Sequence, residues 1–255
     1  MATNLFIANA DIPLASSGAP VLGTPAATGF PVANLFGGNK TDIFKNTGVS
    51  GSSSIRIDLA AAKTFDFLYI GKADLLKKDV VTTVEVFRNT SNTFGTATSV
   101  LTASSFGSAT LYGPRSEDYI ATVSETSAFQ YWWVNYTSSA TSYLPHAKLF
   151  FGKAFDMGRD PGEGATLKRV NPGVAQRDPY YQVELSWTGI SYANTVLFYN
   201  TFVRPRRYNP VILFTKTYHG ILNDHRVLFG RITDATMPPR VTDFNDISIT
   251  FEEVI

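Results

Sequence analysis

The sequence predicts a mainly β protein: an N-terminal jelly-roll β-sandwich, followed by a smaller α+β module in which one helix covers an antiparallel sheet. Two observations predict this fold class. Aromatic residues make up 13% of the 255 residues and charged residues only 17%, a balance typical of strands. Short alternating or apolar segments also recur along the chain with turn residues between them, as in sandwiches and jelly rolls.

The composition also argues against several classes of function. The formal net charge is +1, so no global field attracts nucleic acid or an anionic membrane. The chain has no cysteine, which excludes disulfides, thiolate metal sites and thiol catalysis. No apolar window approaches the length of a transmembrane helix. We also expect no signal peptide, because residues 1–4 carry no basic region.

The first half of the chain holds the segments expected to form the sandwich. Residues 1–50 are rich in Gly, Pro and Ala, and we expect long connections around short strands there, with a partly disordered arm as the alternative. One of these short strands is expected at residues 5–8, and the strands expected after residue 50 are 55–59, 65–70, 80–88, 129–136 and 148–155. Residues 65–70 are apolar on both faces apart from Asp66, which indicates a strand covered on both sides. Residues 96–117 are expected to be loops with one weak strand.

Residues 129–136 contain the heaviest aromatic run of the chain. A strand that is apolar on both faces belongs in a core, and this is the interpretation we favour. The alternative is a surface on which sugar rings stack, since aromatic rings offer flat apolar faces.

Residues 158–179 are expected to separate the two modules. They contain three prolines and four glycines, and no apolar period runs through them. We therefore predict a sandwich over residues 1–157, a linker or arm over 158–179, and the α+β module over 180–255.

The second module begins with an alternating strand over residues 181–188. Ser191 is a suitable helix N-cap, although no Glu or Gln completes a capping box. Apolar residues then recur at helical spacing: Tyr192, Val196, Tyr199 and Val203. Pro205 ends this helix, and residues 211–214, 227–229 and 247–252 are expected to complete an antiparallel sheet.

These elements resemble a known family. The strand at 181–187, the helix after it, the strand with Phe214 and the closing sequence TFEEV at 250–254 resemble the distal-tail and minor tail-tip, or baseplate, proteins of long-tailed bacteriophages.

The first half resembles the discoidin-like jelly rolls fused to phage tail proteins. The matching positions are Asn34-Leu35, Phe44, residues 55–59 (IRIDL), Asp66, residues 70–75 (IGKADL), residues 131–134 (YWWV) and residues 149–152 (LFFG). Three positions depart from the family pattern, with Asp74 in place of Asn, Ala73 in place of His and Ala60 in place of Gly.

The resemblance implies a structural virion protein, made in the host cytoplasm and located at the tail tip. It would form a homo-oligomeric ring, of six copies by family analogy, between the tail tube and the hub, and it would dock peripheral proteins. Discoidin-like jelly rolls often bind glycans through loops, so a carbohydrate-binding adhesin for the host surface is the first alternative. A capsid or tail decoration protein is the second.

We expect subunit contacts around the helix and the following turns, at Tyr192, Arg204, Arg206, Arg207 and Asn223. The plainer interpretation of the arginine cluster is a solvated loop after a helix. We expect a glycan or partner loop at Lys72 and Asp74.

No catalytic, cofactor or metal site is predicted. His219 and His225 flank an expected turn without a third ligand beside Asp224, and His146 is expected to be structural. Residues 158–164 have glycines but lack the Lys-Ser/Thr pair of a phosphate loop, and Asp156, Asp160 and Glu163 lack calcium-loop spacing. We therefore do not expect an enzyme.

Overall fold

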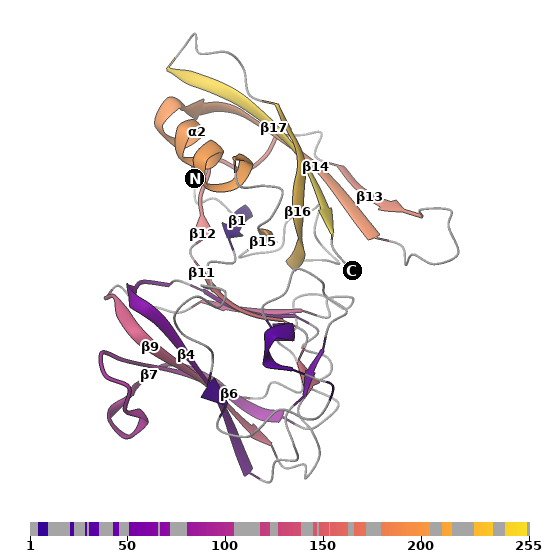
Figure 1. The fold of residues 1–255 in the computed structure, drawn as a ribbon. Helices are drawn as coiled ribbons and strands as arrows, with labels where there is room; N and C mark the ends of the chain where they lie inside the picture. The colour runs from indigo at the N-terminus through magenta and orange to yellow at the C-terminus, as the bar shows by residue number, and fades with distance from the viewer. Residues whose placement is uncertain are drawn as a thin grey trace. The chain divides into compact units, whose positions relative to one another are not determined.

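The computed structural model forms two compact units, each described by itself (Figure 1). The sandwich unit comprises the described residues from Val21 to Gly152. The sheet–helix unit combines Leu5–Asn9 with the described residues from Ala154 to Glu253. The described residues are 5–9, 21–22, 29, 31–35, 43–45, 51–65, 67–71, 81–104, 118–122, 127–138, 145–146, 148–152, 154–162, 166–171, 180–204, 211–215, 227–236 and 243–253.

The sandwich unit is built from antiparallel sheets, as predicted. The five-stranded sheet has the order β2 (Val21–Leu22), β4 (Gly51–Lys63), β9 (Phe129–Ser138), β6 (Val81–Asn89) and β7 (Thr98–Ser104). The three-stranded sheet has the order β11 (Lys148–Gly152), β5 (Phe67–Gly71) and β8 (Tyr119–Thr122). A third sheet pairs β3 (Phe44–Lys45) with β10 (Pro145–His146), and the short 3₁₀ turns are η1 (Val32–Leu35) and η2 (Phe94–Thr96).

The two larger sheets of the sandwich unit meet through aromatic side chains. The ring centroids of Trp132 in β9 and Phe151 in β11 are 5.5 Å apart, and Phe65 lies 5.3 Å and 5.5 Å from these two rings. Because successive side chains of a strand point to opposite faces, Val134 and Tyr136 share the buried side of Trp132. The core interpretation of residues 129–136 is confirmed for these three side chains. Strand β5, buried at every residue, is also central, as predicted.

A buried lysine joins η1 to the three-stranded sheet. Lys148 Nζ donates a hydrogen bond to the carbonyl oxygen of Asn34, 2.6 Å away, and Asn34 Nδ2 donates to the carbonyl oxygen of Ile43 at 2.9 Å. Lys148 stands opposite Gly71 in the register, and a Cβ on Gly71 would lie 3.0 Å from the Lys148 Cβ. The Asn34-Leu35 turn and Gly71 therefore have a structural role in the sandwich.

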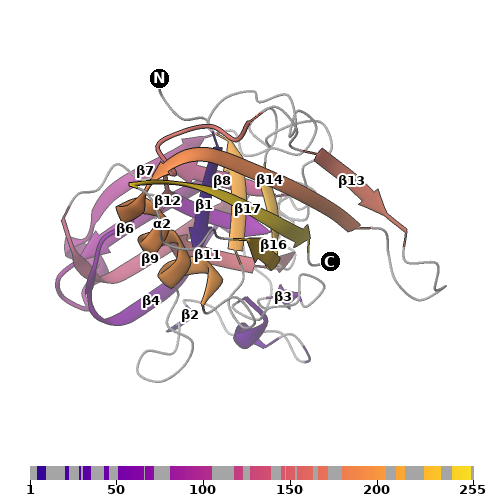
Figure 2. The ribbon, with the colours of Figure 1, turned by 90° about the horizontal axis from the view of Figure 1, so that it is seen from above.

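The sheet–helix unit has one seven-stranded antiparallel sheet. Its strands, in order, are β12 (Ala154–Phe155), β1 (Leu5–Asn9), β15 (Val211–Thr215), β16 (Val227–Thr236), β17 (Phe244–Glu253), β14 (Tyr180–Ser191) and β13 (Thr166–Val170). The helix α2 (Tyr192–Phe198) continues into a π-helical turn, η3 (Tyr199–Val203). Figures 1 and 2 show α2 against the paired strands β14 and β17. The predicted order of strand, helix and three strands is confirmed.

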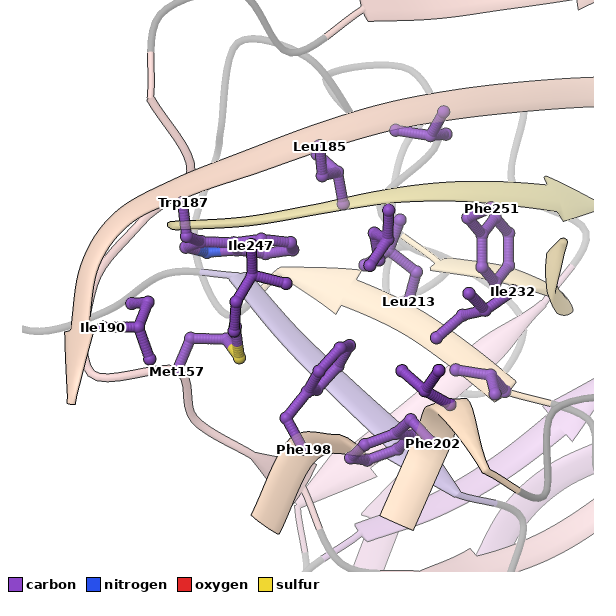
Figure 3. Packing of buried hydrophobic residues seen from close by; sticks show 14 of the residues in the cluster. Met157, Leu185, Trp187, Ile190, Phe198, Phe202, Leu213, Ile232, Ile247 and Phe251 are labelled. Carbon is purple, nitrogen blue, oxygen red and sulfur yellow. The ribbon is translucent and has the colours of Figure 1, made fainter. Parts of the chain in front are cut away.

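The core of the sheet–helix unit lies between the sheet and this helical segment (Figure 3). Trp187 and Ile247 face Phe198 and Phe202 in the close view, and Met157 lies among them. The rings of Phe198 and Phe202 stack with centroids 5.4 Å apart. The predicted alternation of residues 181–188 is confirmed, since its apolar members at 183, 185 and 187 are buried.

The helix begins as predicted but buries a different face. Ser191 Oγ accepts a hydrogen bond from the Asn194 backbone N–H, at 3.3 Å, so Ser191 is the N-cap. The buried side chains are Thr195, Phe198, Phe202 and Val203. The apolar series that predicted the helix is only partly buried: Val203 lies in the core, whereas Val196 and Tyr199 are 37% and 43% exposed.

A π-helical turn follows α2 and adds Val203 to the buried face. The Arg204 N–H donates to the carbonyl oxygen of Tyr199, five residues back, which widens the last turn. Val203 would lie near Val196 and Tyr199 in an α-helix, but the wider turn moves it to the buried side. The spacing of apolar residues in the sequence could not predict that Val203 is buried, because this follows from the wider turn and from contact with the sheet.

Two segments lie elsewhere than the predicted domain boundaries place them. Strand β1, expected in the sandwich, pairs with β15 and β12 of the sheet–helix unit. The described parts of the expected linker also belong to this unit: Gly162 N–H donates to the carbonyl oxygen of Ser186 at 2.8 Å, and β13 pairs with β14. Pairing partners distant in sequence decide both placements.

We predict that Gly230→Ala destabilises the sheet–helix unit by about 3 kcal/mol or more, because overpacking forces backbone shifts. A Cβ at Gly230 would lie 2.0 Å from the carbonyl oxygen of Glu252 and 2.7 Å from the Phe251 ring. Urea unfolding measures the change. Gly95→Ala is the control, since a Cβ there meets nothing within 4 Å, and equal stability of the two variants would contradict the prediction.

Candidate functional site

The expected site residues divide into those that the structure describes and those that it does not. Tyr192 is half-buried at the start of α2, and Arg204 is exposed after η3. The other expected site residues lie outside the described residues: Lys72, Asp74, Arg206, Arg207 and Asn223. Their roles stay predictions. Glu163, His219 and His225 also lie outside, whereas His146 pairs with Phe44 in a two-residue strand.

A different group of side chains gathers on the outward face of the five-stranded sheet. We call Phe87, Phe94, Tyr131 and Trp133 the aromatic platform. Trp133 stands opposite Phe87 of β6 on one side and Arg56 of β4 on the other. It points away from the sandwich core because its neighbour Trp132 points into it.

Phe94 lies in the loop between β6 and β7 and covers the other rings of the platform. Its ring centroid lies 5.2 Å from that of Phe87, edge to face, and 5.7 Å from that of Trp133. This cover leaves Trp133 only 4% exposed, while Phe94 itself is 45% exposed. Tyr131 extends the group, 6.4 Å from Trp133. The result is one exposed ring backed by two others.

Asn89 builds the loop that carries Phe94. Its Nδ2 donates to the carbonyl oxygen of Thr93 at 2.7 Å and to Thr96 Oγ1 at 2.8 Å. Its Oδ1 accepts from the Ser91 N–H at 3.3 Å. One amide thus engages both sides of the loop, as Asn side chains commonly do in turns, and Phe94 is held in place before any ligand arrives.

Polar groups line the margin of the platform. Arg56 Nη1 donates to Asn92 Oδ1. Because that oxygen accepts from Arg56, Asn92 Nδ2 faces the other way as a donor. Gln130 Nε2 donates to Asp58 Oδ1 at 2.9 Å and to the Tyr131 hydroxyl at 3.3 Å. Within the described part of the chain, the buried Nε of Arg56 has no hydrogen-bond partner.

This arrangement suits a ligand with one flat apolar face and polar groups at its edge. The ring of Phe94 offers the apolar contact, and the margin offers donors and acceptors in fixed directions. Among the described residues, no three His, Asp or Glu side chains come together as a metal site would require. Nor does any helix in the described ranges have the length and apolar character to cross a membrane.

Sequence reasoning missed half of this platform. Tyr131 and Trp133 were part of the recognised aromatic run, but Phe87, Phe94 and Arg56 were not singled out. One signal was available: residues 89–96, NTSNTFGT, place a phenylalanine among turn-forming residues. An aromatic residue in such a turn is expected to be partly exposed.

No protein-family model matches the sequence, and no curated protein is similar to it at a significant level. Solved structures do match, at low similarity. Chitosan-binding module 1 of a chitosanase/glucanase from Paenibacillus sp. IK-5 has 14% identity and a TM-score of 0.43, with 56% of this chain and 97% of that chain covered. A CBM32 module of a family 31 glycoside hydrolase from Clostridium perfringens has 13% identity and a TM-score of 0.43, with 54% and 95% covered.

A GH29 fucosidase from Ruminococcus gnavus, in complex with fucose, has 15% identity and a TM-score of 0.43 over 58% of this chain. The match spans 27% of the fucosidase chain. Scores at this level do not bear on what the present chain binds.

We predict that Phe94→Ala exposes Trp133 to water and shifts the tryptophan emission to longer wavelength. The lost ring contacts should lower the free energy of unfolding by about 1–2 kcal/mol. Fluorescence of the folded protein and urea unfolding measure the two effects. Phe244→Ala is the control, because Phe244 is 61% exposed and lies in the other unit. An unchanged emission maximum in Phe94→Ala would contradict the described cover.

Proposed function

We propose that this chain is a carbohydrate-binding protein whose sandwich unit holds a sugar on the aromatic platform. The observation that carries the proposal is the ring of Phe94, 45% exposed and fixed against Phe87 and Trp133. A sugar ring presents C–H groups on one face and hydroxyls at its edge. The first match an aromatic ring, and the second match directed polar groups.

The margin of the platform supports this choice of ligand. The amide of Asn92, oriented by Arg56, supplies a donor beside the exposed ring. The pair of Asp58 and Gln130 adds polar groups on the same face as Tyr131. Hydroxyl groups, which both donate and accept, can use such mixed partners.

Preorganisation supports it further. The Asn89 hydrogen bonds hold the Phe94 loop in its binding geometry, so little conformational entropy is lost when a ligand docks. The resemblance of the first half to discoidin-like jelly rolls agrees with a binding role. The proposal is therefore binding without turnover, by an adhesin-like module.

We expect the full chain to bind members of an array of immobilised neutral and acidic oligosaccharides. Phe94→Ala should weaken binding about tenfold, because the variant loses the apolar area that the ring buries against the sugar, and full burial of a Phe side chain is worth about 1.5–3 kcal/mol. Asn92→Ala tests the margin, and Phe244→Ala is the matched control with an exposed phenylalanine removed elsewhere. Binding to no sugar at all, or equal binding by Phe94→Ala and wild type, would overturn the proposal.

A second candidate is the structural role implied by the phage resemblance. We propose it for the sheet–helix unit: a subunit of a tail-tip ring that contacts tail tube and hub proteins. The observation that favours it is β13, which ends the seven-stranded sheet and is exposed at three of its five residues. A terminal strand is a template for pairing with another chain.

Strand β13 also carries one marked charge pair. Lys168 Nζ lies 2.9 Å from Glu184 Oε1 on β14, and its hydrogen bond and charge hold the pKa of the Glu184 carboxyl below its usual range. The pair favours the β13–β14 register above that pKa, and the contribution is lost as the pH falls through it. Both side chains are about half exposed, so the pair adds only slightly to the backbone pairing that holds β13 on β14.

For this second candidate we expect native mass measurements to find a closed ring, six copies by family analogy, and electron microscopy of the source particle to place it on the tail axis. The comparison is the same measurement at a pH below the lowered pKa of Glu184, where the Lys168–Glu184 pair is lost. A monomer, or a position on fibres or capsid faces, would contradict the ring.

A further inference from the structure

The helical segment of the sheet–helix unit is apolar on both sides. Residues 192–203 contain no charged side chain. One side packs on the sheet through Phe198 and Phe202, yet Val196, Leu197 and Tyr199 on the other side are 37%, 53% and 43% exposed. Asn200 is also exposed in this segment, so the outer side combines these apolar side chains with one amide. We call this exposed side the α2 face; its apolar side chains remain in contact with water.

The two ends of the α2 face carry opposite charges. Arg204 is exposed at the end of η3, and its N–H donates to the Tyr199 carbonyl oxygen at 2.9 Å, which places Arg204 one wide turn beyond Tyr199. At the other end, the carbonyl oxygen of Asp243 accepts from the Tyr192 N–H at 3.0 Å, which puts the exposed Asp243 beside the start of α2. The segment between them is about 18 Å long at 1.5 Å per residue.

This pattern is complementary to itself. When two such segments lie antiparallel, Arg204 of each copy meets Asp243 of the other, and the apolar side chains meet between them. Antiparallel helix dipoles add to the attraction. A two-fold contact of this kind satisfies both copies with the same surface, and the net charge of +1 does not oppose it.

We propose that the α2 face pairs antiparallel with the α2 face of a second copy of this chain, about a two-fold axis. The contact is smaller than a standard interface of about 800 Å² per partner, so the pair is weak and reversible. A pair carries two aromatic platforms. If the carbohydrate proposal holds, avidity for a surface dense in sugars follows, but the pairing itself does not rest on it.

The test is sedimentation equilibrium of the full chain at low ionic strength, from low to high micromolar concentration. We expect a monomer–dimer equilibrium for the wild type, whereas a closed ring of more copies would overturn the two-fold pairing and support the second candidate function instead. Arg204→Asp and Asp243→Arg should each weaken it at least about tenfold, because two attractive pairs per dimer become repulsive. Leu197→Asp should weaken it as well.

Mixing the two charge variants is the decisive arm. In a mixed dimer each reversed charge faces its complement, so association should return to within about threefold of wild type, which no general loss of folding can imitate. Phe94→Ala is the control: it should lose sugar binding and keep pairing, whereas Arg204→Asp should do the reverse. A wild type that stays monomeric, single variants that associate like wild type, or a mixture that is not restored would each overturn the pairing.

Discussion

Consecutive tryptophans on opposite sides of β9 are the constraint on which both the sandwich core and the candidate site depend. Trp132 packs into the core against Phe65 and Phe151, and Trp133 supports the aromatic platform on the outward face. The side-chain period of a strand is two, so a register slip of one residue would exchange these roles. Pairing of β9 with both β4 and β6 fixes the register.

The platform shows how a loop can cover a buried ring on a sheet face and present another ring to solvent. Without Phe94, the outward face of the sheet would leave the large Trp133 ring exposed to water. The β6–β7 loop covers that ring and presents Phe94 in its place, while Asn89 supplies three hydrogen bonds that hold the loop together. Trp133 contributes packing, whereas Phe94 stays 45% exposed and is the ring that the proposed function assigns to a ligand.

The sheet–helix unit follows a different rule. Its sheet collects strands from distant parts of the chain, with β1 and β12 at one edge and β13 at the other. A helical segment without charges covers one end of it, and the π-helical turn brings Val203 into the core. The same turn places Arg204 one wide turn beyond Tyr199. Local backbone geometry thus decides both how the core closes and what surface the unit presents.

The sequence by itself determined the fold class, the alternation of residues 181–188, the Ser191 N-cap and the central positions of β5 and β9, because periodicity and capping are local properties. It did not determine that β1 and β13 join the C-terminal sheet, since strand pairing across long separations leaves no local trace. Nor did spacing reveal the face that α2 buries, because apolar residues occur on more than one face of this segment and contact with the sheet selects the one with Phe198 and Phe202. The platform likewise exists only in three dimensions, where Arg56, Phe87, Phe94 and Trp133 come from three strands and a loop and become neighbours when the sheet forms.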